Sequence, residues 1–412
     1  MYDIVIIGGG ASGLAAAIAA SNIGEGKQKI CILERMDRLG KKLLATGNGR
    51  CNITNVSNDI KHYHGNNRKL IHSVTSNFGY IDTITFFEQL GLLCKEDREG
   101  RVYPYCMQAS VVLDILKNSV LCKGISVKCN FYVNSIIQKH SIFYIKSMDG
   151  SEVLAKKVIL ATGGRASPNL GSDGSGYKIA KDFGHSIIET FPALVQLKSD
   201  SIHKKSLDGI RVIGIAKAVI NKEIIEQEKG EILFTKYGLS GIPIIQLSHL
   251  YGYKPKDTNM SIIIDLMPEF DENYIFKLLN NRRHEEFSKT LETFLVGLLN
   301  KRVGYAILKN LNLYPLSRNS SILTDKQLMA ITKQMKNFEF LITGDMSWNN
   351  AQVTAGGLNT KEFNEESLES LIVKGLYASG ELLDVYGDCG GYNLQWAWAT
   401  GVTCGTYSAS TK

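Results

Sequence analysis

The sequence has few cysteines, no long apolar run and no block of basic residues. Its eight cysteines are scattered over 412 residues, without paired spacing and without a C-x-x-C motif. This pattern counts against a dithiol redox centre and favours a reducing compartment. No apolar run approaches the length of a membrane span, and the 47 basic residues give a net charge of only +7 without clustering. We therefore expect neither a membrane nor a nucleic-acid partner.

Signatures of several other chemistries are also missing. The sequence shows no repeat of fixed period and no motif that supports Ser-His-Asp catalysis. His62 and His64 form an H-x-H pair, but no further ligand set accompanies them, so a surface turn is predicted rather than a metal site. Asp3 interrupts any apolar start and no basic leader precedes it. We therefore expect no signal peptide and a cytoplasmic location.

The overall composition is that of a globular protein. Hydrophobic residues make up 44% of the chain and charged residues 21%, which are ordinary values. A chain of 412 residues can bury a large core and is expected to form two or three domains.

The N-terminal segment has the pattern of a dinucleotide-binding fold. Residues 3–7 form a continuous apolar, β-branched run, as in a buried parallel strand. The motif GGGASG follows at 8–13, and residues 14–20 favour a helix. A second apolar strand at 29–33 ends in Glu34, 21 residues after the last glycine of the motif. A G-x-G-x-x-G motif between strand and helix, with an acid at this distance, predicts nucleotide binding.

The glycines of this motif have separate physical roles. Gly8 permits the tight turn, Gly10 lets the backbone approach a pyrophosphate, and Gly13 allows close packing of helix and strand. Glu34 would accept a hydrogen bond from a ribose hydroxyl. The motif by itself does not distinguish NAD from FAD.

Two later segments point to a long anionic ligand. Residues 40–55 form a loop of small and amide residues that carries Lys42 and Arg50. Near the other end of the chain, residues 376–379 read as a strand, followed by an acidic glycine-rich turn and a helix that opens at 390–393. A helix start without side-chain bulk offers free N–H groups to an electron-rich partner. The two chain ends therefore predict one cofactor site with an insertion between them.

Five blocks of sequence resemble those of a known family. The chain resembles the FAD-binding flavoproteins of the aminoacetone oxidase and BaiN-like (bile-acid reductase) group. TGNGRCN and GGYNLQWAW are specific to it, whereas GGGASG and ATGG occur in many flavoproteins. The blocks span almost the whole chain: GGGASG at 8–13, TGNGRCNITN at 46–55, ATGG at 161–164, LFTKYGLSG at 233–241, and the C-terminal segment with TAGG at 354–357.

The chain departs from the family pattern at three places. Lys236 stands where the family usually has His, residues 240–243 read SGIP in place of SGP, and Tyr386 replaces a common acidic residue. If these positions face the substrate, this protein's substrate differs from that of its relatives.

The resemblance implies a fold class and a domain organisation. It is an α/β fold, with a discontinuous Rossmann-like FAD-binding domain and an inserted antiparallel β-barrel domain that carries a small helical subdomain. From about Phe191, short strands divided by polar turns favour such a barrel. The predicted parts are 1–190 and 346–412 for the FAD domain, and 191–345 for the barrel domain with a helical insertion at about 268–318.

The resemblance also implies the residues that contact FAD. Glu34 would hold the adenosine ribose, and Asp384 or Glu381 the ribityl–phosphate region. The helix start at Gly391 would stabilise the negative charge that reduction places near N1 and O2 of the flavin. The implied contacts are Gly8, Gly10, Ser12, Gly13, Glu34, Arg35, Lys42, Arg50, Cys51, Asn52, Val133, Thr162, Gly163, Gly380, Asp384, Gly391, Tyr392, Asn393 and Leu394.

No catalytic side chain is predicted, because hydride transfer at flavin N5 needs no obligatory acid or base. Cys51 and Cys389 both lie in cofactor-contacting blocks, and buried, inert thiols are the favoured interpretation. Core packing is at least as good an interpretation of Trp396 and Trp398 as a substrate contact. The substrate-facing candidates are Tyr103, Tyr105, Tyr386, Asp388, Tyr392 and Trp396.

Three functions follow from this reading. The first is an FAD-dependent oxidoreductase that reduces a small or steroid-like enone, with NADH or NADPH as a transient donor and hydride transfer through flavin N5. The second is an amine oxidase of the aminoacetone type that uses oxygen and produces hydrogen peroxide. A flavin-containing RNA-modifying or redox-sensing protein is the third. The sequence does not choose the substrate, the electron partner or the oligomeric state.

Overall fold

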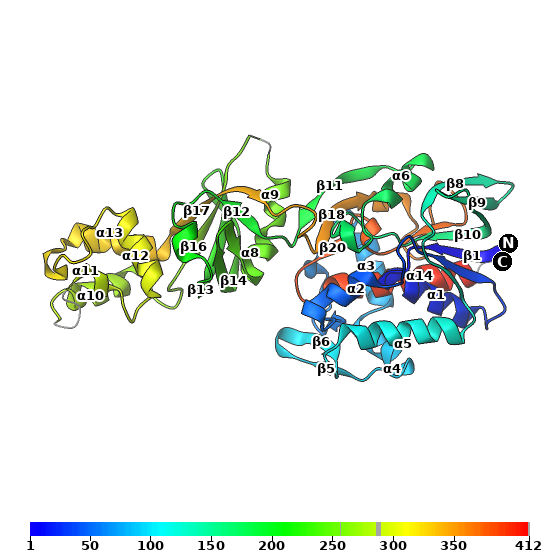
Figure 1. The fold of residues 1–412 in the computed structure, drawn as a ribbon, viewed down its shortest axis with the longest axis horizontal. Helices are drawn as coiled ribbons and strands as arrows, with labels where there is room; N and C mark the ends of the chain where they lie inside the picture. Colours follow the sequence, from blue (N-terminus) through cyan, green and yellow to red (C-terminus); the bar gives the residue numbers. More distant parts are fainter. Residues whose placement is uncertain (256, 286–289, 411–412) are drawn as a thin grey trace. The chain divides into compact units, whose positions relative to one another are not determined.

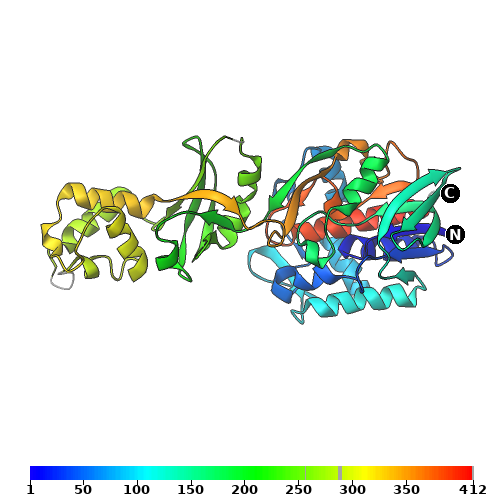
Figure 2. The same cartoon turned by 45° about the horizontal axis from the view of Figure 1, so that its top comes forward.

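The computed structural model describes residues 1–255, 257–285 and 290–410. The chain forms two compact units. Unit 1 consists of Met1–Pro192 and Trp348–Lys412, and unit 2 of Ala193–Ser347. Figures 1 and 2 show a sheet with helices in unit 1, and a barrel with helices in unit 2.

A mixed sheet of seven strands organises unit 1. Four strands lie in the order β7-β2-β1-β10, all parallel, and β19 pairs in parallel with the end of β10. β9 and β8 continue the sheet from β10 as an antiparallel meander. The strands are β1 (Tyr2–Ile7), β2 (Ile30–Leu33), β7 (Ser126–Lys128), β8 (Val133–Lys139), β9 (Ile142–Ser147), β10 (Glu152–Leu160) and β19 (Leu376–Ala378).

Two long helices from opposite ends of the chain pack together in this unit. α1 (Ala11–Ile23) is rich in alanine and buried over ten of its residues, as expected for a helix that is apolar all round. α14 (Tyr392–Ser410) lies beside it. A side chain at Gly401 would meet the carbonyl oxygen of Ser12 at 2.3 Å. Glycine in α14 therefore lets two backbones approach where larger residues would not fit. Near the end of α14, the Ala409 carbonyl accepts a hydrogen bond from Gln28 Nε2 at 2.9 Å, which holds α14 beside the loop that follows α1.

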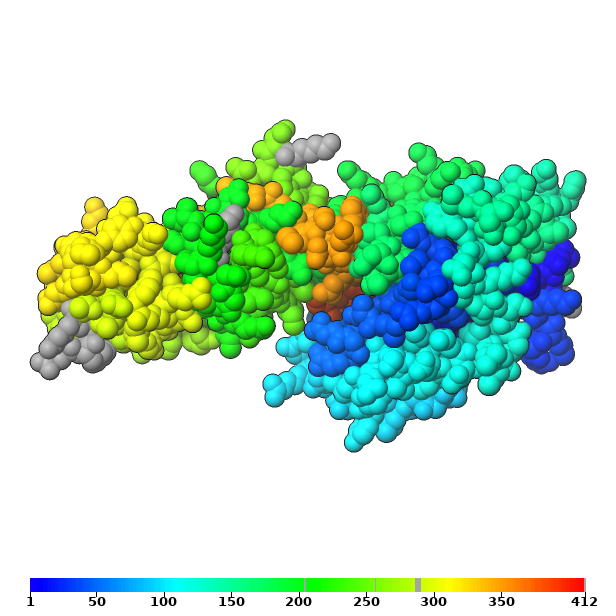
Figure 3. Space-filling view, viewed as in Figure 1, coloured from blue at the N-terminus to red at the C-terminus, as the bar shows by residue number. Residues whose placement is uncertain are grey.

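The remaining elements of unit 1 are short. β20 pairs with β4, β3 and β5 flank β6, and β11 pairs with β18, next to the points where the chain leaves and re-enters the unit. In Figure 3 the surface of this unit shows segments before residue 50 (blue) beside segments near residues 100–150 (cyan and teal). The remaining strands are β3 (Thr54–Asn55), β4 (Tyr63–His64), β5 (Cys94–Glu96), β6 (Arg101–Pro104), β11 (Ile187–Ala193), β18 (Val353–Leu358) and β20 (Tyr386–Gly387). The remaining helices are α2 (Lys41–Ala45), α3 (Arg68–Asn77), α4 (Tyr80–Gln89), α5 (Ala109–Cys122) and α6 (Ser175–Asp182), with 3₁₀ turns η1 (Thr46–Gly49), η2 (Ile60–His62), η3 (Arg98–Gly100), η4 (Pro168–Leu170), η7 (Thr360–Glu362) and η8 (Gly380–Leu382).

Unit 2 contains a closed barrel of six strands in the order β12-β15-β14-β13-β16-β17. Its neighbouring strands pair antiparallel, and β12 pairs with β17 to close the barrel. Buried and less buried residues alternate along β13, as expected when one face lines the interior. The elements are β12 (Leu197–Ser199), α7 (Lys204–Leu207), β13 (Arg211–Ile220), β14 (Glu223–Thr235), β15 (Gly238–Ser240), α8 (Ile242–Leu247), α9 (His249–Tyr253), β16 (Met260–Asp265) and β17 (Phe338–Asp345).

A helical segment lies between β16 and β17. It extends further than the predicted 268–318, because α13 follows that range. Thr324 and Gln327 form a capping box that starts α13. The residues 324–327 match the S/T-x-x-E/Q pattern, so the sequence alone could have predicted a helix start here. The helices are α10 (Glu272–Arg282), α11 (Leu291–Phe294), α12 (Lys301–Asn310) and α13 (Asp325–Lys336), with the 3₁₀ turn η6 (Ser320–Ile322).

The fold class predicted from the sequence is confirmed. Unit 1 has the Rossmann-like sheet, and unit 2 has the antiparallel barrel with its helices. Among the described residues, no helix is both long and apolar enough to cross a membrane.

Candidate functional site

The start of α1 has the geometry of a phosphate-binding turn. Gly8 has a φ of +108°, and a side chain there would meet the carbonyl oxygen of Ala161 at 2.3 Å. A side chain at Gly13 would lie 1.9 Å from the carbonyl oxygen of Gly8. Around Gly10, by contrast, no described heavy atom lies within 4 Å of such a Cβ, and no described side chain caps the helix. The start of α1 therefore has free space beside Gly10 and no side-chain cap, as a phosphate-binding helix start requires.

Glu34 is held directly beside this turn. One carboxylate oxygen accepts a hydrogen bond from the Gly9 N–H at 2.7 Å, and the other from the Met36 N–H at 2.8 Å. The residue is buried. A carboxylate has lone pairs for further donors, so Glu34 can also accept from a ribose hydroxyl.

Two of the predicted basic contacts are paired with carboxylates. Arg35 forms an ion pair with Asp173 and lies 5.4 Å from the ring centre of Tyr132. Lys42 Nζ lies 2.7 Å from Glu381 Oε2. Each ion pair fixes a loop of unit 1, and each leaves donors for a phosphate or a ribityl hydroxyl.

Glu381 joins the N-terminal loop to the C-terminal segment. Its Oε1 accepts hydrogen bonds from the backbone N–H and the hydroxyl of Thr354, at 2.9 and 2.8 Å. The Thr354 oxygen in turn accepts from the N–H of Arg165. Together with Lys42, this network connects parts of the chain that lie more than 300 residues apart.

The loop TGNGRCN places its residues in different environments. Arg50 is exposed, and its guanidinium lies 5.1 Å from the ring centre of Tyr103. Cys51 is buried, and burial raises the pKa of its thiol to about 12, which agrees with an inert thiol. Asn52 Oδ1 is buried without a hydrogen-bond partner among the described residues. A buried acceptor of this kind favours a donor supplied by a ligand.

The start of α14 lies against this loop. Gly391 has a φ of +107°, and a side chain there would meet the Thr54 carbonyl oxygen at 2.5 Å and Asn52 Oδ1 at 2.9 Å. Gln395 Oε1 accepts hydrogen bonds from the hydroxyls of Thr54 and Thr83, at 2.6 and 2.8 Å. The orphan acceptor of Asn52 therefore lies at the N-terminus of α14.

The other implied contacts lie at ends of strands and in turns. Val133 begins β8 and is buried. Thr162 and Gly163 follow β10, and a side chain at Gly163 would meet Ser172 Oγ at 2.7 Å. Gly380 faces Ser12, because a side chain there would lie 2.7 Å from Ser12 Oγ. The predicted contacts from the two chain ends are thus neighbours in unit 1.

Asn393 holds the turn before α14. Its Oδ1 accepts from the Gly387 N–H at 2.8 Å, and its Nδ2 donates to the carbonyls of Gly387 at 2.7 Å and Asp388 at 3.2 Å. Its neighbour Leu394 is half-buried and packs against the core.

Asp384 is a buried carboxyl in the acidic turn. Burial raises its pKa to about 6, although a hydrogen bond from Asn66 opposes this shift. Asn66 Nδ2 donates to Asp384 Oδ2 at 2.9 Å.

The prediction of a surface turn at His62 and His64 is wrong. His62 Nδ1 lies 2.9 Å from Asp388 Oδ2, and His64 Nε2 lies 2.6 Å from Asp388 Oδ1. The exposed fractions are only 23% and 30% for the two imidazoles and 18% for the carboxylate. The sequence analysis missed this cluster because the H-x-H pair and its carboxylate are more than 320 residues apart and meet only when β4 pairs with β20.

The two imidazoles bind different oxygens of Asp388 and do not converge on one point. Within the described residues, no group of His, Cys, Asp and Glu is arranged to hold a metal ion. Each ring also stacks on a tyrosine: His62 on Tyr392 with ring centres 4.4 Å apart, and His64 on Tyr386 at 4.8 Å. Three substrate-facing candidates, Tyr386, Asp388 and Tyr392, therefore belong to this cluster.

The other substrate-facing candidates have mostly structural surroundings. Trp396 is fully buried, and its indole N–H donates to the Gly380 carbonyl at 3.1 Å. Trp398 is also buried and donates to the Ile53 carbonyl at 3.0 Å. Tyr103 is buried beneath Arg50, whereas Tyr105 is exposed. Core packing therefore accounts for both tryptophans.

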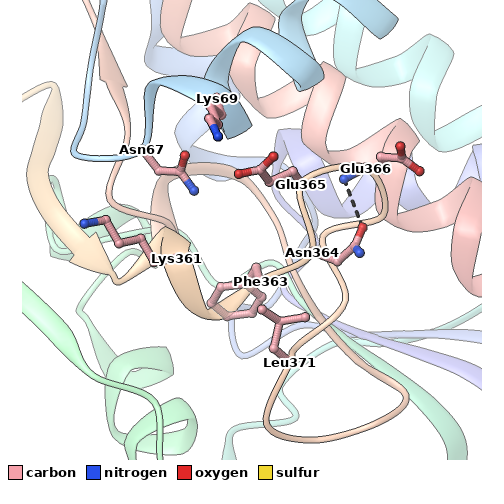
Figure 4. A pocket seen from close by; sticks show the side chains of 8 residues that line it. All are labelled: Asn67, Lys69, Lys361, Phe363, Asn364, Glu365, Glu366 and Leu371. Atoms are coloured by element: carbon pink, nitrogen blue, oxygen red, sulfur yellow. Dashed lines mark hydrogen bonds between the residues drawn. The ribbon is translucent and has the colours of Figure 1, made fainter.

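A separate hollow of about 670 Å³ opens on unit 1. Figure 4 shows two lysines and two glutamates among its lining side chains, so their charges balance. None of the implied FAD contacts lines it. Its lining residues are Asn67, Lys69, Lys361, Phe363, Asn364, Glu365, Glu366 and Leu371.

A second histidine network is structural. His185 Nδ1 lies 2.9 Å from Glu362 Oε2, and its Nε2 lies 2.9 Å from Ser370 Oγ. These distances resemble those of a hydrolytic triad. However, Ser370 Oγ is buried and also accepts the N–H groups of Ile372 and Val373. The network therefore braces this loop.

Two of the departures from the family pattern lie in unit 2. The Lys236 backbone N–H donates to Asp208 Oδ1 at 2.9 Å in the turn after β14. Ile242 begins α8 with an exposed side chain. The third departure, Tyr386, lies in unit 1.

A Rossmann-like sheet with a glycine-rich α1 start, a buried acid beside it and a second helix start beside a buried acceptor is typical of flavoproteins of the FAD-binding class. The comparisons with known proteins place the chain more closely. It belongs to the HI0933-like family: the model described as "HI0933-like protein Rossmann domain" matches residues 2–407.

Named relatives cover nearly the whole chain. It is 39% identical over 412 residues to a 3-dehydro-bile acid delta(4,6)-reductase of Clostridium scindens, covering 99% of both proteins. It is 29% identical over 406 residues to the ribosomal RNA dihydrouridine synthase of Escherichia coli K12, covering 98% of this chain and 97% of the relative. The solved 3-ketosteroid-delta4-(5alpha)-dehydrogenase of Rhodococcus jostii RHA1 has the same fold, with a TM-score of 0.50, 15% identity, and coverage of 100% of this chain and 97% of that one. The protein is an FAD-dependent oxidoreductase.

Proposed function

We propose that the protein reduces a carbon–carbon double bond conjugated to a carbonyl in a small or steroid-like substrate, with NADH or NADPH as electron donor. The observation that carries the proposal is the 39% identity, over the full length, to a bile-acid reductase. The FAD site of unit 1 supports the redox part. The donor is proposed on chemical grounds, because reduction of an enone consumes two electrons that the cell supplies as NAD(P)H.

The chain's own residues would hold FAD along one path. The N–H groups after Gly10 bind its pyrophosphate and Glu34 its adenosine ribose. Arg35, which follows β2, and Lys42, which lies in α2, would supply positive charge beside this path. When bound, FAD supplies the hydride for the substrate.

At the ring end of this path, two features of α14 act. Its N-terminus at Gly391 and Tyr392 would favour negative charge on the reduced ring. The buried Oδ1 of Asn52, which has no hydrogen-bond partner among the described residues, would accept a hydrogen bond from the cofactor.

A second candidate function has its own support. The 29% identity to ribosomal RNA dihydrouridine synthases favours an RNA substrate over the expected absence of a nucleic-acid partner. The chemistry is closely related, because the C5=C6 bond of uracil is conjugated to the C4 carbonyl. The +7 charge is compatible with either substrate class.

Anaerobic stopped-flow mixing of the oxidised protein with electron donors and acceptors distinguishes these functions. Under anaerobic conditions NADPH or NADH should bleach the flavin band, and a 3-oxo bile acid with 4,6-conjugated double bonds should restore it. Restoration only by uridine-containing ribosomal RNA would select the second candidate. A flavin reduced by aminoacetone but not by either nicotinamide, with hydrogen peroxide formed in air, would contradict both and select the amine oxidase.

A further inference from the structure

The His62–Asp388–His64 cluster is a preorganised acid–base group at the start of α14. Backbone pairing places it there: His64 lies opposite Tyr386 in the β4–β20 ladder, and the Asp388 N–H donates to the His62 carbonyl at 2.9 Å. Asn393 holds the Asp388 turn from the first turn of α14. The cluster is therefore fixed from three segments. Its carboxylate, Asp388, precedes Tyr392, the first residue of α14, by four residues. The start of α14 is implied to contact the flavin ring.

The carboxylate of Asp388 is kept ionised. Burial alone would raise its pKa, but the hydrogen bonds from His64 and His62 outweigh this effect and lower it. One nitrogen of each imidazole lies within hydrogen-bonding distance of this carboxylate, which holds both rings in place. Each ring uses one nitrogen for Asp388, and His62 Nε2 lies 3.4 Å from Ser57 Oγ on its other side. Partial exposure of both rings gives solvent a route to return a proton.

We propose that this cluster supplies the proton of the reduction, with His62 and His64 as the donors and Asp388 as their positioning residue. This inference rests on the proposed function. The β-carbon of the conjugated double bond receives hydride from FAD that NAD(P)H has reduced, and the π electrons move towards the α-carbon. An imidazolium N–H bond breaks as the new C–H bond forms at the α-carbon. The neutral ring then takes a proton from water, so the net addition to the substrate is two hydrogens.

The stacked tyrosines determine how the donors are held. Tyr392 and Tyr386 lie nearly parallel to the imidazoles, at interplanar angles of 18° and 20°. Stacking and the bond to Asp388 together leave each ring little rotational freedom, which is the preorganisation that proton transfer requires. Tyr386 is one of the departures from the family pattern. Its contact with His64 places this departure in the proposed proton-donor cluster.

The test separates the two half-reactions. His62→Asn and His64→Gln each keep an N–H near the nitrogen that binds Asp388 but remove the ionisable ring, and both are combined in a double variant. His72→Asn is the matched control, because His72 is an exposed residue of α3. Flavin content and anaerobic reduction by NADPH report on folding and on the half-reaction that needs no substrate proton.

The double variant should keep its flavin and be reduced by NADPH within about threefold of the wild-type rate. Its flavin reoxidation by the conjugated 3-oxo bile acid should fall about 100-fold or more, with partial rescue by added imidazole, and His72→Asn should match wild type. Reoxidation of the double variant at the wild-type rate would overturn the proton-donor assignment. Failure of wild type itself to be reoxidised by the enone would instead overturn the proposed function. If the double variant loses its flavin, Asp388→Asn and the two single variants provide the same comparison.

Discussion

The two helix N-termini of unit 1, at Ala11 and Tyr392, are built in different ways. At α1 the glycines, the strand before them and the helix after them are contiguous, and the space beyond Gly10 is open. At α14 the surroundings come from distant segments: Thr54 and Asn52 crowd Gly391, and β4 contributes His64. A helix start built from one continuous segment can bind a phosphate without help from other parts of the fold. A helix start surrounded by distant segments can place acidic and basic side chains around a reacting group.

At the start of α1, Gly13 is closely surrounded by backbone atoms, whereas Gly10 has free space beside it. Gly13→Ala should lower the free energy of unfolding by about 3 kcal/mol or more, because its Cβ would lie 1.9 Å from the Gly8 carbonyl oxygen and neither backbone can move away. Chemical denaturation of the flavin-free protein measures this loss.

Gly10→Ala is the matched control for that loss. Gly10 has an extended backbone with a φ of −81°, and its Cβ would meet no described atom within 4 Å. We expect unfolding free energy within about 1 kcal/mol of wild type. Equal destabilisation by the two alanines would show that the open space at Gly10 has been misassigned.

On the α14 side, the buried Asp384 gives a smaller effect that depends on pH. Its folded pKa of about 6 lies above that of an unfolded aspartate, so its contribution to stability is fully present below about pH 4 and is lost as pH rises through about 6. Asp384→Asn should therefore raise the unfolding free energy at pH 7.5 by an amount on the order of 2 kcal/mol and leave it nearly unchanged at pH 4. Denaturation at the two pH values measures the difference. A stabilisation that is the same at both would exclude burial of the charge as its cause.

The parts of the fold that could be predicted were those that local sequence determines. β1, α1 and β2 follow from apolar periodicity and glycine spacing, and the barrel follows from short alternating strands. The start of β14 at Glu223 follows a tight turn. Asn221 and Lys222 both have positive φ, at 52° and 68°, so they form a two-residue hairpin turn. An asparagine between two apolar runs was the available signal.

The site could be predicted only in part, for the same physical reason. The glycines around α1 and α14 could be identified, but their contacts with FAD stay predictions. The histidine–aspartate cluster could not be found, because nothing local to His62 indicates that Asp388 lies beside it. The pairing of Lys42 with Glu381 was hidden in the same way, because it depends on tertiary packing over 339 residues of sequence.

The central claim is that both helix starts bind one FAD, and titration of the flavin-free protein with FAD tests it most directly. Wild type should bind one FAD per chain. Gly10→Ala, which places a methyl group where the pyrophosphate is predicted to bind, and Asn52→Ala, which removes the orphan acceptor beside Gly391, should each weaken that same binding about tenfold or more. Neither should lower the stability of the flavin-free protein. If either variant binds FAD as tightly as wild type, the two helix starts do not share one cofactor, and the account is wrong.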